Sequence, residues 1–374
     1  VDSPGPLAGA APSATAWIVV ERLGPWGRDA LEDSGLNSDC VAHLRWALDT
    51  HGVRTILARR SGSRRVGARD EPNTTENADV PSPPRNVWVA ACGPSGGIGR
   101  HGQMSAFSEL LQWDLEALGR GVLPKFGVAM EDAREFVCTH GKRDVCCATS
   151  GRGYALARQA SVPNAHVWEC SHLGGHRFAP TCLILPSGRL YGRLDAAGFY
   201  PAGSEPSPDF LRGASYLNPA AQAADQAVRS ALALPASPPT HPPDPNDLNG
   251  GSVSVTVRTP EQGTWRVTCT ANTIEAPASC GAPPTVRTLW QAEIASAPPG
   301  AHPDNPEVDT WQLSRTQPSF APFLMSPSPI STANPRRSVR SPTAGRAFVG
   351  RCLRAAVRAC VRARVRACMC MCAC

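Results

Sequence analysis

The sequence lacks the segments that send a protein into or across a membrane. No run of its 374 residues approaches the roughly 18 consecutive apolar residues that a membrane-spanning helix needs. The first twenty residues, VDSPGPLAGAAPSATAWIVV, have no basic region and only a short apolar patch, so we expect no secretory signal peptide. They also lack an initiator methionine, and we expect a fragment or a processed chain. The compartment we predict is the cytoplasm.

Acidic residues and lysine are missing beyond Asp309, where the chain carries eleven arginines. The whole chain has a formal net charge of +6, from 37 basic and 31 acidic residues. Without those eleven arginines, residues 1–309 have 26 basic against 31 acidic side chains, a net charge of −5. The basic character belongs to the tail and not to the body. We therefore predict neither a nucleic-acid partner nor a membrane partner.

Two glycine-rich motifs lack the context that would make them functional. GPSGG (93–97) fits the pattern of a nucleophile elbow, but the helix does not begin directly after its serine. GIGRHG (97–102) fits a dinucleotide fingerprint, but the acidic residues that follow fall within a predicted helix and not at the end of a strand. A phosphate-binding G-K-[ST] sequence is absent as well. We interpret residues 93–105 as a flexible loop.

The cysteines do not follow a disulfide framework. Six of the 15 lie in the arginine-rich tail, and the other nine are irregularly spaced in a chain without a secretory signal. This usage is typical of a reducing compartment with a metal or redox site.

Hydrophobic periodicity predicts an α/β (α+β) fold in two halves. The first half reads strand, helix, strand over 16–60, then a strand at 86–92 and a helix at 108–121. The second reads strand (134–140), helix (153–160), strand (165–171), hairpin (181–195) and helix (218–234). We place domains at 6–123, with a disordered insertion at 61–86, and at 124–235. A Pro-rich linker at 236–249, a small C-terminal hairpin segment at 250–295 and a disordered or non-native tail at 296–374 follow.

Chemistry concentrates in two short stretches, CTHGKRDVCC (138–147) and WECSHLGGHRF (168–178). The second is no zincin helix, because no glutamate follows His172 and Gly174-Gly175 interrupts the pair. Those glycines let the backbone curl so that His172 and His176 converge. Each stretch follows a predicted strand, and open α/β sheets bind ligands beyond such strand ends.

Two thiolates and two imidazoles suit either zinc in a Cys₂His₂ site or a [2Fe–2S] cluster with mixed ligands. Eight residues separate Cys138 from Cys147, whereas structural zinc sites use shorter spacings, so the longer loop favours the cluster. A zinc-stabilised interaction module stays open as an alternative. So does a thiol oxidoreductase that uses the adjacent Cys146 and Cys147, although its usual C-x-x-C motif is absent.

Together with the extended stretch VWECSHLGGHRFAPTCLILPSGRLYGRLD, these motifs resemble the sucrase/ferredoxin-like family. The resemblance covers roughly residues 6–294. It implies that the second half is a thioredoxin-like ferredoxin domain with a [2Fe–2S] cluster bound through C-x₈-C and H-x₃-H. The implied iron ligands are Cys138, Cys147, His172 and His176. The implied activity is one-electron transfer with an unknown redox partner protein, either as a carrier or as a reductase component, and no argument for sucrase activity arises.

Four further side chains near these motifs are candidates for supporting the cluster: Cys146, His140, Asp144 and Arg177. We expect Cys146 to be structural or to lie next to the ligands. Cys170 and Cys182 are predicted to be strand residues that face the core. The N-terminal half is interpreted as a diverged relative of the second half, with no chemistry assigned to it.

Overall fold

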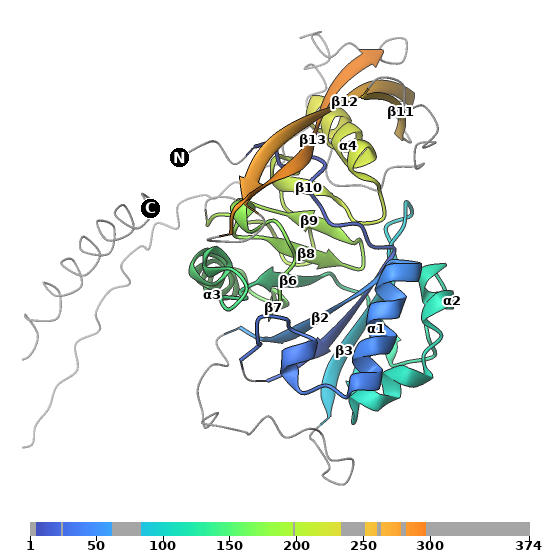
Figure 1. The fold of residues 1–374 in the computed structure, drawn as a ribbon, viewed down its shortest axis with the longest axis vertical. Coiled ribbons are helices and arrows are strands. Elements are labelled where there is room, and N and C mark those ends of the chain that lie inside the picture. The colour runs from blue at the N-terminus through green and yellow to red at the C-terminus, as the bar shows by residue number, and fades with distance from the viewer. Residues whose placement is uncertain are drawn as a thin grey trace, which may run out of the picture. The chain divides into compact units, whose positions relative to one another are not determined.

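The computed structural model describes residues 5–23, 25–61, 84–196, 199–232, 251–259, 263–277 and 282–296. All of these described residues belong to one compact unit (Figure 1). Most of the predicted insertion at 61–86, all of the linker at 236–249 and all but the first residue of the tail at 296–374 lie outside the described residues.

The first half is a β-α-β unit followed by an antiparallel pair of strands. It comprises β1 (Ala16–Glu21), α1 (Ser38–His51), β2 (Val53–Arg60), β3 (Arg85–Ala91) and β4 (Ile98–Met104). The side chain of Asn37 caps α1 by accepting a hydrogen bond from the backbone N–H of Asp39, and Gly52 ends the helix in the left-handed conformation. A 3-10 turn at Glu32–Ser34 precedes α1, and β5 (Val128–Ala129) pairs with β4.

The second half repeats this order. It comprises β6 (Arg134–Cys138), α3 (Arg152–Ser161), β7 (Val167–Cys170), β8 (Cys182–Leu185) and β9 (Arg189–Tyr191). A π-helical turn at Cys147–Gly151 leads into α3, and 3-10 turns lie at His176–Phe178 and Pro208–Phe210. β10 (Leu211–Ala214) pairs with β9, and α4 (Pro219–Ala231) follows.

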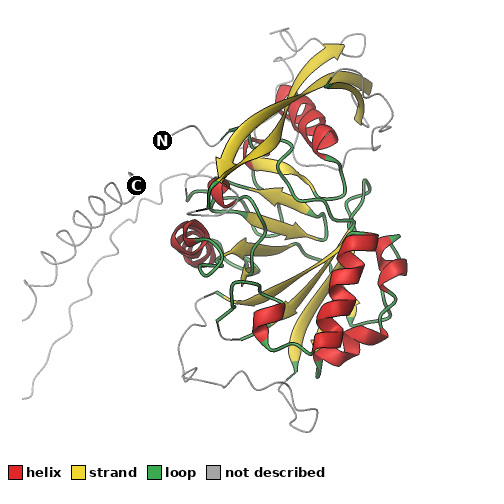
Figure 2. Cartoon of the chain, viewed as in Figure 1, coloured by secondary structure: helices red, strands yellow, loops and turns green. Residues whose placement is uncertain are grey.

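Both halves belong to one ten-stranded sheet with the order β10-β9-β8-β6-β7-β2-β1-β3-β4-β5. In each half the strands that flank the helix are parallel, and the next strand pairs antiparallel with the first. The halves meet where β2 and β7 run antiparallel, with Arg59 opposite Glu169. The segments predicted as domains 6–123 and 124–235 share this one continuous sheet (Figure 2).

Apolar clusters cover both faces of this sheet. Side chains of α1 pack on Ile18, Val20 and Leu57 on one face. On the other face Trp17, Val19 and Ile56 of the first half join Phe136 and Trp168 of the second in one cluster. Trp88 contacts both Trp168 and Phe136 edge to face, with ring centroids 4.5 and 5.4 Å apart. Burying apolar side chains from both halves in one cluster stabilises their association.

The C-terminal segment forms a separate three-stranded sheet that packs on α4. Its strands are β11 (Ser252–Thr259), β12 (Gly263–Pro277) and β13 (Pro284–Ser296), joined antiparallel in that order. Val253, Val255 and Trp265 bury their side chains against Ala224 and Val228 of α4. The predicted hairpin is thus confirmed and extended by a third strand.

Two predictions for the first half were wrong. Residues 98–104, interpreted as part of a flexible loop, form β4 along the whole length of β3. The helix predicted at 108–121 is split into a 3-10 segment, Phe107–Gln112, and a short α2, Leu115–Gly119. Asp114 causes the break, because its extended backbone and its side-chain bond to the N–H of Ala117 start a new helix.

Candidate metal centre

Cys138 is the last residue of β6 and lies beside Cys170, the last residue of the parallel strand β7. The backbone N–H of Thr139 donates to the carbonyl of Cys170, which keeps the two strand ends together as their loops begin. The loops of the two chemical motifs therefore leave the same edge of the sheet, as the sequence predicted.

The loop after β6 makes a tight turn that brings Cys147 back to Cys138. The N–H of Asp144 donates to the carbonyl of His140, and the N–H of Cys147 donates to the carbonyl of Asp144. Cys147 then begins the π-helical turn that leads into α3. Both Cys138 and Cys147 are only 1% exposed.

The loop after β7 begins with a hydrogen-bonded connection to the first half. The N–H of Ser171 donates to the carbonyl of Leu57, and the hydroxyl of Ser171 accepts from the N–H of Leu57. His172 follows directly, and its position is thus set by β2 as well as by β7.

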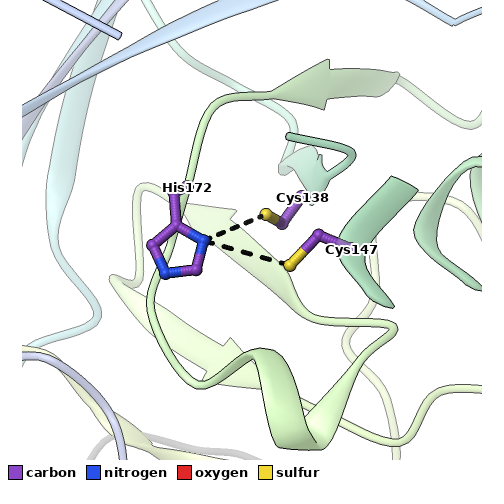
Figure 3. Close-up of side chains that lie close together, drawn as sticks. All are labelled: Cys138, Cys147 and His172. Atoms are coloured by element: carbon purple, nitrogen blue, oxygen red, sulfur yellow. Dashed lines mark hydrogen bonds between the residues drawn. The ribbon is translucent and has the colours of Figure 1, made fainter. Parts of the chain in front are cut away.

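Three ligand atoms converge where these loops meet. The Nδ1 of His172 lies 4.0 Å from the Sγ of Cys138 and 3.9 Å from the Sγ of Cys147 (Figure 3). All three ligand atoms lie within 4.8 Å of one another. Among the described residues this is the group whose His, Cys and acidic side chains are placed to bind a metal ion.

The pKa values of the two thiols shift in opposite directions. The pKa of Cys138 is held well below its usual value because its sulfur accepts a hydrogen bond from Cys147, despite burial. The same contact, together with burial, raises the pKa of Cys147. One thiolate is thereby available next to the imidazole, and thiolates are the form of cysteine that binds metals.

His176 lies outside this group and faces the same carboxylate as His172. Asp144 is 1% exposed; its Oδ2 lies 3.5 Å from Nε2 of His172, and its Oδ1 lies 3.9 Å from Nδ1 of His176. The other ring nitrogen of His176, Nε2, is 3.3 Å from the carbonyl of Pro277. Of the four expected ligands, the structure thus joins three directly and connects the fourth through Asp144.

Of the other candidates near the motifs, His140 is turned away from the thiols. Its Nε2 contacts the carbonyl of Gly27, its ring meets Trp26 edge to face, and burial lowers its pKa. Cys146 is half-buried outside the three-atom group. Cys170 and Cys182 are fully buried strand residues, as predicted.

The sequence reasoning missed Arg212 of β10, which lies beneath the histidine loop. Its Nη1 donates to the carbonyl of Gly174, and its Nη2 donates to that of Ala10. Burial, with the charge of the neighbouring Arg177, lowers its pKa to about 10, although Cys138 and Cys147 act in the opposite direction. No local signal indicates this role, because β10 follows the histidine loop by more than thirty residues.

The donor set fits a transition metal. Two sulfurs and one imidazole nitrogen are ligands that zinc and iron accept. Around a tetrahedral zinc, sulfur and nitrogen at about 2.3 and 2.0 Å from the ion would be about 3.5 Å apart. The observed 3.9 and 4.0 Å are slightly wider, and the carboxylate beside His172 is the kind of partner that orients metal-bound imidazoles.

Residues 7–200 match the family model described as sucrase/ferredoxin-like. No curated protein and no solved structure matches the chain. Among the described residues, no helix combines the length and apolar character needed to cross a bilayer.

Proposed function

The chain belongs to the sucrase/ferredoxin-like family, and on this premise we propose that it is a [2Fe–2S] redox protein that transfers single electrons. The proposed ligands are Cys138, Cys147, His172 and His176. The observation that carries the proposal is the convergence of both thiols and His172 at one buried edge of the sheet, with His176 facing the same buried carboxylate.

Mixed ligation has a definite consequence for such a centre. When bound, the cluster supplies reversible one-electron chemistry, at a higher potential with two imidazole ligands than with four thiolates. The thiols of Cys138 and Cys147 contribute negative charge in a site from which water is excluded by burial. His172 is the one member of the three-atom group with an exposed side chain, at 20%, and its imidazole is the natural contact for a redox partner.

Asp144 positions both imidazoles and their protons. It lies 3.5 Å from Nε2 of His172, on the opposite side of the ring from the Nδ1 that faces the sulfurs. The negative charge of the carboxylate attracts a proton on Nε2, which favours the tautomer in which Nδ1 is the ligand atom. Loss of that proton on oxidation would make electron transfer depend on pH.

We also propose that each half is a thioredoxin-like unit. The support is the shared order of a parallel β-α-β unit followed by an antiparallel hairpin, β6-α3-β7 with β8-β9 and β1-α1-β2 with β3-β4. A cytoplasmic location and an unidentified redox partner protein complete the proposal.

Zinc is the second candidate, favoured by one observation. The three ligand atoms surround a single point at separations close to those of one tetrahedral ion, whereas a two-iron cluster needs space between the thiols and the histidines. A zinc-stabilised interaction module would leave the protein colourless. The thiol oxidoreductase reading loses support, because the thiol that meets Cys147 is Cys138 and not the adjacent Cys146.

Anaerobic purification of the full chain separates these candidates. We expect coloured protein with two irons and two acid-labile sulfides per chain, and an absorption band that bleaches on reduction. Stoichiometric zinc without colour would overturn the redox proposal.

Serine variants test the ligand assignment in the same preparation. Cys138→Ser and Cys147→Ser should abolish the colour, because each removes a buried sulfur from the three-atom group. Cys146→Ser is the matched control and should keep the colour, because Cys146 lies outside the three-atom group. The assignment would be contradicted if Cys146→Ser lost the colour while Cys138→Ser and Cys147→Ser kept it.

A further inference from the structure

A cavity of about 190 Å³ opens beside the metal centre, on the side of the first half. It lies where β7 ends at Cys170, opposite Ala58, so that none of the described strands pairs with the first residues of β2 on that side. Arg54, Thr55 and Ile56 of β2 form one wall, and His140 and His172 form another. An unpaired strand edge presents backbone polar groups to whatever enters.

The walls of this cavity are positively charged. Four arginines line it, namely Arg28, Arg45, Arg54 and Arg143, against a single acidic residue, Asp29. That aspartate is already paired, since it lies 2.5 Å from Arg45, and its pKa is lowered by the hydrogen bond from this arginine in spite of partial burial. The lining therefore carries a net charge of about +3 with its histidines neutral.

Arg54 is a half-buried cation in this lining. Its Nε is buried and has no hydrogen-bond partner among the described residues. Its guanidinium lies 5.9 Å from the ring centre of Trp17, and burial lowers its pKa. No described carboxylate forms an ion pair with Arg54 or with Arg28. A half-buried guanidinium without a carboxylate is costly unless an anion binds it.

The size and lining of the cavity restrict the ligand. At about 30 Å³ for each water, it holds roughly six waters, less than the 300 Å³ or more of a pocket for a drug-sized molecule. Among the described residues that line it, the only aromatic side chains are those of His140 and His172. Guanidinium groups bind carboxylate and phosphate oxygens with paired hydrogen bonds.

We propose that this cavity is a binding site for a small oxyanion, the phosphate or carboxylate group of a small molecule, held by Arg54 and Arg28 beside His172. Arg143 adds charge at the rim of the cavity. The site brings such an anion against the imidazole of the metal centre, but its binding does not depend on which metal that centre holds.

Isothermal titration calorimetry of the full chain with inorganic phosphate and with malonate, at constant ionic strength in chloride, tests the proposal. We expect saturable binding of at least one anion with a stoichiometry of one. Arg54→Gln should weaken it by about tenfold or more, as expected for the loss of a charge-assisted hydrogen bond. Phosphate preferred over malonate identifies a phosphoryl ligand, and the reverse identifies a carboxylate; both support the shared chemistry.

Two further variants keep the test decisive. Arg28→Gln changes an exposed side chain, so it should weaken binding without affecting folding even if Arg54→Gln is unstable. Arg266→Gln on β12 removes the same charge from the separate small sheet and should leave binding unchanged. No saturable heat with either anion, or equal weakening by all three variants, would overturn the site. Repeating the titration on metal-free protein separates this proposal from the redox proposal. Anion binding that persists there supports the anion site even if the metal centre proves not to be a [2Fe–2S] cluster.

Discussion

The guanidinium of Arg59 lies 2.8 Å from the carboxylate of Glu169, and this buried ion pair joins the two halves of the sheet. Nε of Arg59 donates to the same oxygen, Oε2, at 3.0 Å, and the hydroxyl of Thr139 donates to it at 2.9 Å. Thr139 directly follows Cys138, a proposed ligand, and Arg59 also lies 4.2 Å above the ring of Trp26. The first half thus supports the backbone from which the metal loop begins.

Glu169→Gln should destabilise the protein by about 3 kcal/mol, because it leaves the guanidinium of Arg59 buried without a countercharge. Urea unfolding measures the change. Arg59→Met combined with Glu169→Leu should recover much of the loss, since no charge remains buried. Glu116→Gln is the control: its partner Arg120 is 62% exposed, so the effect should stay below about 0.5 kcal/mol. If the double variant is no more stable than Glu169→Gln, this account is wrong.

His176→Ala separates a two-iron cluster from a single zinc. His176 contacts Asp144 but stands outside the three-atom group. If it is an iron ligand, we expect the variant to lose its visible absorption and at least half of its iron. If Cys138, Cys147 and His172 bind one zinc, the variant should retain stoichiometric zinc. Metal analysis after dialysis, beside Cys147→Ser as the variant that loses metal in both cases, decides between them.

The two glycines of the histidine loop should respond differently to alanine. Both have a positive φ, +75° at Gly174 and +70° at Gly175, which costs an alanine roughly 1–2 kcal/mol. A Cβ at Gly174 meets open space, whereas one at Gly175 would lie 2.4 Å from Nη2 of Arg212. We therefore expect Gly175→Ala to lower metal retention and the melting temperature more than Gly174→Ala. Equal effects would show that Arg212 does not support this loop.

The free energy of unfolding should fall in alkaline solution, because thiols that stay protonated in the folded protein ionise once unfolding exposes them. Burial raises the pKa of Cys182 well above its usual value, so the folded protein keeps a proton that the unfolded chain loses above about pH 8.5. The contribution is complete below pH 8.5 and declines as pH rises, by up to about 1.4 kcal/mol per pH unit. Urea unfolding in reductant between pH 8 and 10.5 should give a shallower decline for Cys182→Ala. Cys92, whose pKa burial raises to about 12, should behave alike when replaced; unchanged slopes in both variants would contradict the prediction.

Segments with strong local patterns were predicted well. The strand, helix and strand over 16–60 have continuous apolar strands around an amphipathic helix, and they form β1, α1 and β2. The hairpin at 181–195 has its turn at Pro186-Ser187-Gly188, and it forms β8 and β9. In both cases the information lies within a few residues of the element itself.

β4 was missed because its sequence, IGRHGQM, resembles a loop. Its glycines serve close packing: a Cβ at Gly99 would lie 2.7 Å from Sδ of Met130, and one at Gly102 would lie 2.9 Å from Cα of Gly127. The strand forms because β3 supplies a hydrogen-bonding partner along its whole length. Glycine lowers the intrinsic β-strand propensity of this segment, and it forms a strand only because a partner strand is available.

The sequence by itself determined which ligand types the protein offers and how they are spaced, two cysteines eight residues apart and two histidines separated by Leu173, Gly174 and Gly175. Tertiary structure decided that Cys138, Cys147 and His172 meet, that Asp144 lies between the histidines, and that four arginines surround the neighbouring cavity. The reason is physical: these contacts depend on the register of β6 on β7 and of β7 on β2. Register follows from packing across the whole sheet, and no local pattern of residues specifies it.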